Sequence, residues 1–313
     1  LTQSLTGLDE IIVVGYGTMK KSDLTGSVVR ADIESFREAP NVSVMQSLQG
    51  SVAGLNVGQV NQSGEEPDIL IRGMSSISGE TSPLIVVDNV IFRGNIIDIN
   101  PNDIASIDIL KDASSAAIYG SQASNGVILI TTTRSGGVDG KPIFNYSSYY
   151  SFQSPVKELI PGTPEEYIKK TEESDIYNSR IASSGYLDLN PAWNPSGKFK
   201  TSEEIAAYNQ GRSTDWYDLL TNDNMYTQNH NLSLTNSTKF NNYLISIGYT
   251  DQNGYMLNED YSRLNARINI DNNITEWLQI GVQSFMTLSD YSGQDANPNN
   301  RYLSPYATAY DEN

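Results

Sequence analysis

The stretch Arg263–Asp271, RLNARINID, alternates polar and apolar side chains without a break. Its apolar members are Leu264, Ala266, Ile268 and Ile270. Successive side chains of a β-strand point to opposite faces of a sheet, so a period of two predicts a strand with one apolar and one polar face.

The same pattern occurs four more times along the chain, over 144–152, 226–235, 243–250 and 278–288. Strands of about nine to eleven residues that are apolar outside and polar inside are typical of outer-membrane β-barrels. The sequence therefore predicts antiparallel transmembrane β-barrel strands. A soluble antiparallel sandwich also has alternating strands and stays open as the alternative.

The connections between these segments alternate in length. The links around 236–239 and 272–276 are short, the link 251–262 is longer, and 153–224 is a very long excursion. Short periplasmic turns and longer extracellular loops alternate in barrels of this kind. We therefore expect an extracellular loop at 153–224, with a helical stretch over 164–181 for which Thr163 is the N-cap.

Composition excludes several classes of function. The 313 residues carry a net charge of −17, which argues against nucleic-acid binding because phosphate contacts need clustered Lys and Arg. There is no cysteine, so thiolate metal sites are excluded. The single histidine, His230, lies within a predicted strand, and a lone histidine in such a position is typically a structural or interfacial residue. We expect no enzymatic activity, no cofactor and no metal site.

The region before the Gly-rich break at 135–141 has a different character. Five short strands are predicted there, at 27–30, 54–57, 68–72, 83–90 and 127–133, with a turn at Asp88-Asn89 in the fourth. Short helices are predicted over 43–49 and 113–119, the second between Asp112 as N-cap and Gly120 as the residue after its end. This mixture predicts a compact α+β domain.

Two motif-like strings do not match the sites they resemble. Val14–Gly17, VGYG, lacks the third glycine and the following helix of a dinucleotide-binding turn. In Asp98–Asn102, DINPN, the start of a calcium loop is followed by Asp103 where glycine is required. Neither a Rossmann site nor an EF-hand is predicted.

Several longer phrases resemble one family closely. They are LDEIIVVGYGTMKKSDLTGSV (8–28), SLQGSVAGLNV (47–57), ILIRGMSS (69–76), PLIVVDNV (83–90) and DIASIDILKDASSAAIYGSQASNGVILITTT (103–133). In this order and spacing they resemble the plug domain of the SusC/RagA class of TonB-dependent outer-membrane transporters of Bacteroidota. The phrase STDWYDLLTND (213–223) and the strands after it resemble the first part of that family's barrel.

The resemblance implies three regions. They are a lead with a TonB-box-like segment (1–17), the plug domain (18–137), and the first part of a transmembrane barrel (138–313). Family barrels have about 22 strands with the plug in the lumen. Because an open sheet in lipid leaves backbone groups unpaired, we expect this chain to be the N-terminal part of a longer transporter, with a periplasmic N-terminus.

The resemblance also implies roles for residues of the lead and the plug. Asp9, Glu10, Ile11, Ile12, Val13 and Val14 resemble the TonB box, which adds as an extra strand to the periplasmic domain of TonB. An ordinary first plug strand is the alternative. The residues expected to seat the plug against the barrel wall are Asp68, Arg72, Gly73, Asp88 and Asp108. Surface salt bridges without functional weight are the alternative for each.

Substrate contacts are expected in two places. The first is the outward-facing plug loop 75–81, with Ser75, Ser76, Ser78, Gly79 and Glu80, for which a plain solvent loop is the alternative. The second is the long excursion, where Trp193 and Trp216 have ring faces that stack on sugars or dock a partner.

The function implied by the resemblance is TonB-dependent active import of an oligosaccharide across the outer membrane. The expected partners are TonB, a SusD-like surface lipoprotein that forms an external lid, the substrate and outer-membrane lipid, with no nucleic acid. The alternatives are import of an oligopeptide, a ligand-sensing receptor, and a structural subunit of an outer-membrane assembly.

Overall fold

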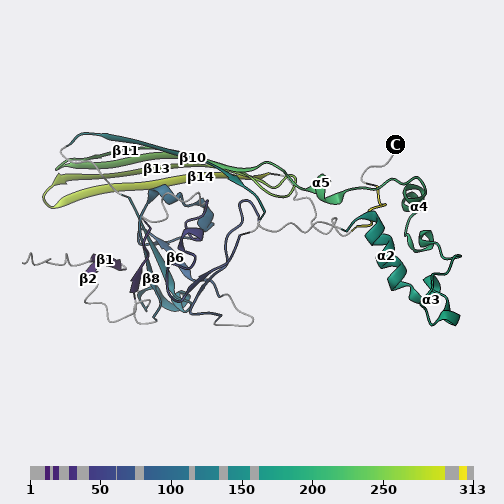
Figure 1. Cartoon of the computed structure of the whole chain (residues 1–313). Coiled ribbons are helices and arrows are strands. Elements are labelled where there is room, and N and C mark those ends of the chain that lie inside the picture. The colour runs from purple at the N-terminus through teal and green to yellow at the C-terminus, as the bar shows by residue number, and fades with distance from the viewer. Residues whose placement is uncertain are drawn as a thin grey trace, which may run out of the picture. The chain divides into compact units, whose positions relative to one another are not determined.

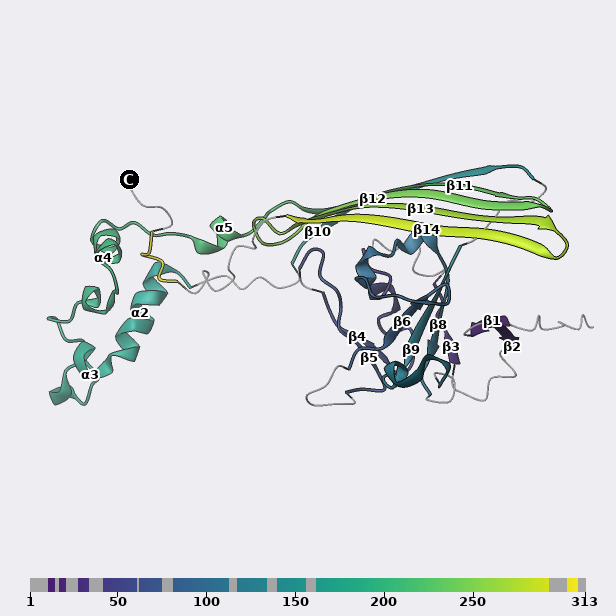
Figure 2. The same cartoon turned by 180° about the vertical axis from the view of Figure 1, so that it is seen from behind.

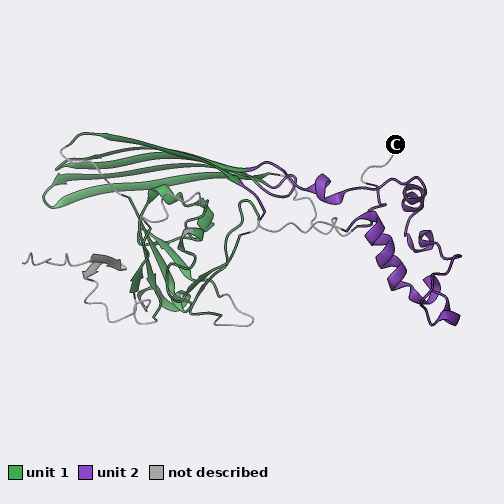
Figure 3. Cartoon of the chain, viewed as in Figure 1, with its two compact units in different colours: residues 1–152, 226–253, 260–292 green, residues 153–225, 254–259, 293–313 purple. Residues whose placement is uncertain are grey.

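A computed structural model of the chain describes residues 11–14, 17–20, 28–33, 42–60, 62–74, 81–112, 117–133, 140–155, 162–292 and 303–308. The chain divides into two compact units (Figure 3). Unit 1 comprises 1–152, 226–253 and 260–292, and unit 2 comprises 153–225, 254–259 and 293–313. Unit 1 therefore contains the plug region and nearly all of the alternating strands.

Unit 1 contains a five-stranded sheet whose strands follow one another in chain order (Figure 1). They are β10 Ile143–Gln153, β11 Met225–Ser237, β12 Asn241–Asn253, β13 Asp260–Thr275 and β14 Leu278–Ser292. From β11 to β14 each pair is antiparallel. The predicted antiparallel strands are confirmed. They are longer than predicted, because the backbone ladder continues beyond the apolar residues, as at Asp260 and Ser292.

In this sheet the apolar face is exposed and the polar face is buried, which is the reverse of a sheet in a soluble protein. Ile247 and Leu288 are 51% and 58% exposed, whereas Arg263 and Asn269 are 1% and 2% exposed. Figures 1 and 2 show the plug on one side of this sheet, and hydrogen bonds from the plug to Asn231 and Ser246 identify that side as the polar face. Strict alternation therefore separates a polar face that packs on protein from an apolar face that does not.

The connections at the two ends of this sheet differ in length. At one end, 238–240 join β11 to β12 and 276–277 join β13 to β14. At the other end, 254–259 join β12 to β13, and the long excursion 154–224 joins β10 to β11. The predicted alternation of short and long links is confirmed. The link 254–259 is shorter than predicted because β12 and β13 extend into it.

The plug is built on a second five-stranded sheet, of order β3-β8-β9-β6-β7. Its strands are β3 Val28–Arg30, β6 Leu84–Val87, β7 Val90–Ile91, β8 Ile104–Leu110 and β9 Val127–Thr132. β6 and β9 are parallel, and the other pairs are antiparallel. A smaller sheet pairs β4 Leu55–Val57 with β5 Ile69–Ile71. Ile107, Ile109 and Ile128 lie fully buried in the core. The five strands predicted for this domain are confirmed.

One plug strand, β8, is not predicted from the sequence pattern. Its register shifts between Ile104 and Ser106, and this irregularity breaks the alternation by which a strand is recognised. The hairpin of β6 and β7 is predicted correctly. Asp88 and Asn89 have φ values of 46° and 71°, as a type I′ turn requires.

The helical segments described in the plug are short 3-10 turns. They are η3 Gln46–Leu48, η4 Ile96–Asp98, η5 Pro101–Asp103 and η6 Ala117–Ala123. Of these, η3 lies within the predicted helix 43–49, and η6 overlaps the end of the predicted helix 113–119. Residues 113–116 of the predicted helix 113–119 lie outside the described residues. Gly120 has a positive φ of 69°, as its predicted position requires, but helical turns continue beyond it.

Unit 2 contains short helices joined by irregular chain. They are α2 Pro164–Ser174, α3 Ile176–Ser179, η7 Ala182–Ser184, η8 Pro195–Lys198, α4 Ser202–Asn209 and α5 Trp216–Leu220. Thr163 forms a capping box with Glu166 at the start of α2, which confirms it as an N-cap. The predicted helix 164–181 is interrupted at Asp175, which leaves helical geometry.

Aromatic rings form the centre of unit 2. Tyr306 is buried, and its ring lies 5.3–6.3 Å from those of Tyr167, Phe199 and Tyr208. The segment that carries Tyr306 therefore packs against the long excursion within the same unit. Within the described ranges of the chain, no helix has both the length and the apolar character needed to cross a membrane.

Gly64, in the connection between β4 and β5, allows that connection to approach the sheet closely. A Cβ atom at Gly64 would lie 2.5 Å from the buried ring of Tyr261, whereas a Cβ at Gly50 would meet nothing within 4 Å. Both glycines have a left-handed backbone, with φ of +71° and +73°.

We expect Gly64→Ala to destabilise the protein by about 1–3 kcal/mol more than Gly50→Ala. Both substitutions strain the backbone equally, but only the first overpacks against a ring. The measurement is the free energy of unfolding of the two variants in urea. Equal losses would contradict this expectation, because they would mean that the Tyr261 ring moves aside at no cost.

Candidate functional site

The inward-facing residues of β13 lie against successive parts of the plug. Arg263 donates to the carbonyl oxygen of Ile97. Two residues on, the amide of Asn265 donates to the carbonyl oxygen of Asp98 at 2.8 Å. Alternate residues of a strand share a face of the sheet. The polar residues at every second position of β13 therefore form a row of hydrogen-bond donors that faces the plug.

The next inward residue, Arg267, forms a buried ion pair with the plug. Its guanidinium lies 2.7 Å from Asp88, and the two side chains are 7% and 5% exposed. Asp88 also accepts from the backbone N–H and the hydroxyl of Thr132, at 3.0 and 2.5 Å. The carboxylate therefore ties the β6–β7 turn, the end of β9 and the sheet together.

The segment Asn95–Asp103 supplies most of the remaining plug contacts. Asn100 donates to Asn231 of β11 at 2.9 Å, and Asp103 accepts from Ser246 of β12 at 2.8 Å. Asp98 accepts from Ser289 of β14 at 2.9 Å. We call these contacts, together with the Asp88–Arg267 pair and the bonds from β13, the seam.

A glycine in the polar face of β12 makes room for one of these contacts. A Cβ atom at Gly248 would lie 2.5 Å from the amide nitrogen of Asn100. Any side chain at this position would therefore displace the Asn100–Asn231 bond. Asp98, Asn100 and Asp103 belong to the string that resembles a calcium loop, so their polar character is visible in the sequence but their partners are not.

Burial affects the acidity of the seam. Burial raises the pKa of the Asp103 carboxyl above its ordinary value of 3.8, against the opposing effects of the Ser246 hydroxyl and the Arg267 guanidinium. The folded state therefore favours the protonated carboxyl. The stability that this group contributes is greatest at low pH and falls as the pH rises from 3.8 through the raised pKa.

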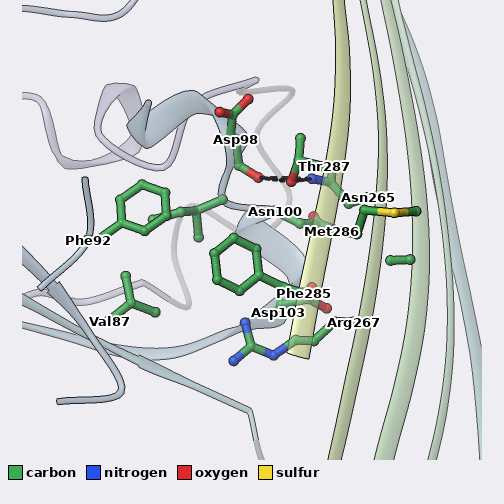
Figure 4. A pocket seen from close by; sticks show the side chains of 12 residues that line it. Val87, Phe92, Asp98, Asn100, Asp103, Asn265, Arg267, Phe285, Met286 and Thr287 are labelled. Carbon is green, nitrogen blue, oxygen red and sulfur yellow. Dashed lines mark hydrogen bonds between the residues drawn. The ribbon is translucent and has the colours of Figure 1, made fainter. Parts of the chain in front are cut away.

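A small cavity lies within the seam (Figure 4). Its volume is about 20 Å³, which is room for about one water molecule. Figure 4 shows Arg267 and Phe285 of the sheet on one side and Val87 and Phe92 of the plug on the other. The described residues contain no group of three or more side chains suited to holding a metal ion. The seam is therefore a close-packed polar contact that leaves no room for a large ligand.

Of the residues predicted to seat the plug, Asp88 contacts the sheet. Asp108 and Arg72 form ion pairs within the plug, with Arg30 at 2.9 Å and with Asp112, and their predicted seating role stays a prediction. Asp108 lies opposite Arg30 in the β3–β8 ladder, so the register of these two strands brings the two side chains together. The side chain of Asp68 is exposed, and Gly73 has a φ of +92° on an exposed loop.

Parts of the predicted TonB-contact and substrate segments lie outside the described residues, namely Asp9, Glu10, Ser75, Ser76, Ser78, Gly79 and Glu80. Ile11–Val14 form strand β1, which pairs antiparallel with β2 Gly17–Lys20. This pair is a two-stranded sheet of its own and is separate from the plug sheet. The chain therefore adopts extended structure where a TonB-binding strand is predicted.

The two tryptophans predicted to meet substrate are both engaged within unit 2. Trp216 is 8% exposed, and its indole N–H donates to the carbonyl oxygen of Ser304 at 2.9 Å. Stacking of a sugar on this ring would require the interior of the unit to open. Trp193 is half-buried and donates to Asp175 at 3.1 Å, so one ring edge is already bound.

We expect the Asp88–Arg267 pair to contribute strongly to plug docking, because removing one partner of a buried ion pair costs about 3–5 kcal/mol. Asp88→Asn keeps the turn chemistry and removes the charge, and Arg267→Met removes its partner. In a double-mutant cycle the double variant should lose less than the sum of the single variants.

The matched control is the exposed pair Arg72–Asp112, whose side chains are 54% and 29% exposed. Its coupling, measured with Arg72→Met and Asp112→Asn, should be about 0.2–1 kcal/mol. Free energies of unfolding in urea check both cycles. A coupling at Asp88–Arg267 no larger than at the control pair would contradict the role given to it.

Comparison with known proteins places these features in a family context. Residues 20–127 match the family model of the TonB-dependent receptor plug domain. A TonB-dependent receptor of Formosa agariphila is 35% identical over 280 residues, covering 88% of this chain and 26% of the relative. The TonB-dependent receptor SusC of Bacteroides thetaiotaomicron is 32% identical over 273 residues, covering 84% of this chain and 24% of the relative.

Solved structures show the same fold. The RagAB peptide importer in its open-open state matches with a TM-score of 0.73 and 24% identity, covering 91% of this chain and 33% of that one. The closed-closed state matches with a TM-score of 0.68 and 23% identity, covering 85% of this chain and 31% of that one. The chain spans about a quarter of the length of the curated relatives it matches.

Proposed function

We propose, because this chain belongs to the TonB-dependent receptors of the SusC/RagA type, that it takes part in TonB-dependent import of an oligosaccharide across the outer membrane. The observation that carries the proposal is the inverted sheet, whose apolar face is open while its polar face binds the plug. Such a sheet suits a barrel wall between lipid and a plugged lumen. Its relatives are receptors and transporters, which are not enzymes.

The register of the sheet supports a position for the membrane boundary. Tyr249, Leu264 and Leu288 form one row on the outward face, and Asp251, Ser262 and Asp290 form a parallel row two residues on. The change from apolar to polar side chains between these rows marks the outer edge of the hydrocarbon layer in this proposal. The polar row lies toward the long connections, which are extracellular in this proposal.

Aromatic side chains at this boundary support the same assignment. His230 lies opposite Tyr249, in the apolar row, and its ring nitrogen Nδ1 lies 2.8 Å from the hydroxyl of Tyr146 on β10. Tyr150 stacks on Tyr226 with ring centroids 5.5 Å apart. Rings with a polar tip gather where headgroups meet hydrocarbon, so His230 is assigned an interfacial rather than a catalytic role.

The proposed boundary makes a direct labelling experiment possible, because the chain has no cysteine. Met286→Cys and Asp290→Cys place single thiols on the same face of β14, on the two sides of the boundary. We expect a membrane-impermeant maleimide to label intact cells at position 290 and to leave position 286 unlabelled, because hydrocarbon excludes the reagent. Detergent extraction is the control, since it should expose both thiols. Equal labelling in intact cells would contradict a lipid-facing sheet.

Energy coupling is assigned to the lead. Strand β1 pairs with β2 alone, so one of its edges is unpaired among the described strands. We propose that Asp9–Val14 adds as a strand to the periplasmic domain of TonB through this backbone. A SusD-like lipoprotein is the proposed external partner. The loop 75–81 and Trp193 are the proposed substrate contacts.

The second candidate substrate is an oligopeptide. The fold match to the RagAB peptide importer favours it, and at 24% identity that match concerns the fold alone. Uptake of a labelled oligosaccharide pool and of a labelled peptide pool by the same cells would separate the two candidates.

We expect proline in β1 to abolish import without lowering the amount of protein in the membrane. Neighbouring backbone N–H groups of a strand point to opposite edges, so one of Ile12→Pro and Val13→Pro must remove a donor that faces TonB. Ile12→Val and Val13→Ile are matched controls that keep the backbone donors. Uptake of the labelled pools is the measurement. Normal uptake by both proline variants would rule out strand addition at this segment.

A further inference from the structure

The seam lies at one end of the central plug strands. β8 begins at Ile104, directly after the bonded segment 95–103. β9 ends at Thr132, which lies opposite Ile104 in the ladder, and β6 ends beside Asp88. The antiparallel pairing of β8 with β9 and the parallel pairing of β9 with β6 bring these three ends together at the wall.

The bonds of the seam are spread across the wall. They engage β11 through Asn231, β12 through Ser246, β13 through Arg267 and β14 through Ser289. Two acceptors on the plug side are backbone carbonyl oxygens, those of Ile97 and Asp98, which cannot rotate away from the sheet as a side chain can. Opening the seam would therefore break bonds to four neighbouring strands in one step.

The chain itself also holds the plug to this wall. β9 ends at Thr132, and the next strand along the chain is β10, which begins at Ile143 and pairs with β11 in the wall. The lead lies at the other end of the plug sequence and reaches it through β3, an edge strand of three residues. β3 pairs with 108–110, the end of β8 that is distant from the seam.

The seam offers no passage for a substrate. Its cavity of about 20 Å³ is far smaller than the roughly 300–1,000 Å³ of a small-molecule site. An oligosaccharide or peptide that used this side would have to separate the plug from all four strands.

We propose that the seam stays closed during import, and that substrate passes the plug on the side turned away from β10–β14. This inference rests on the import function proposed above. The strands β11–β14 then serve as a fixed support, and the rearrangement that opens a path is confined to parts of the plug outside 88, 95–103 and 132.

The absence of cysteine allows the seam to be locked selectively. One lock is Asp103→Cys with Ser246→Cys, whose native side chains lie 2.8 Å apart. A second and independent lock is Asn100→Cys with Asn231→Cys, at 2.9 Å. The locks are closed in cells with the shortest bis-methanethiosulfonate reagent and opened with a reductant. The four single-cysteine variants, treated identically, are the matched controls.

The measurement is uptake of the labelled oligosaccharide and peptide pools as a function of the locked fraction. The expected result is a rate of uptake that does not change with the locked fraction for either pair. A rate that falls in proportion to the locked fraction and returns with reductant, at either pair, would overturn the proposal. If one pair disturbs folding, the other still decides the question.

The two proposals fail in different ways. Unmodified protein that takes up neither pool would count against import itself, and the inference about the seam would fall with it. Normal uptake by the unmodified protein together with loss on locking would overturn the closed seam alone.

Discussion

The structure depends on one constraint, which is that polar side chains of β11, β12 and β13 are buried on the face of the sheet that meets the plug. A buried hydrogen-bonding group without a partner costs about 1–3 kcal/mol, and a buried charge costs more. On β13 the plug supplies partners for Arg263, Asn265 and Arg267 in turn. The sheet therefore needs the plug, and the plug is positioned by the side chains that it satisfies.

Charge is handled differently at neighbouring points of this contact. Arg267 meets a carboxylate at 2.7 Å, so its charge is neutralised directly. Arg263 is 1% exposed and bonds a neutral carbonyl and a hydroxyl instead. Asp103 is bonded to a hydroxyl, and burial raises its pKa. The contact therefore combines one strong ion pair with neutral and charge-assisted hydrogen bonds, and together these specify a single register between plug and wall.

Close backbone approach supports this register. Gly64 lies against the Tyr261 ring, and Gly248 lies against Asn100, each at a point where a Cβ would clash. Unit 2 is organised by different forces, namely aromatic packing around Tyr306 and capping boxes at Thr163 and Thr201. It comprises 153–225, 254–259 and 293–313 and contains none of the residues of the seam.

The sequence by itself determined the strands and their two faces, the Asp88-Asn89 turn and the Thr163 cap. Each depends on residues that are close together in the chain: the alternation of apolar and polar side chains, two residues that tolerate a left-handed backbone, and a hydroxyl that caps a helix. The sequence did not determine β8, whose register shift breaks this alternation. Only the tertiary structure decided that Asp88 meets a residue 179 positions away while Asp108 pairs with Arg30, and that Trp216 is buried. Acidic side chains look alike in a sequence, and their partners are set by which strand ends the fold brings together.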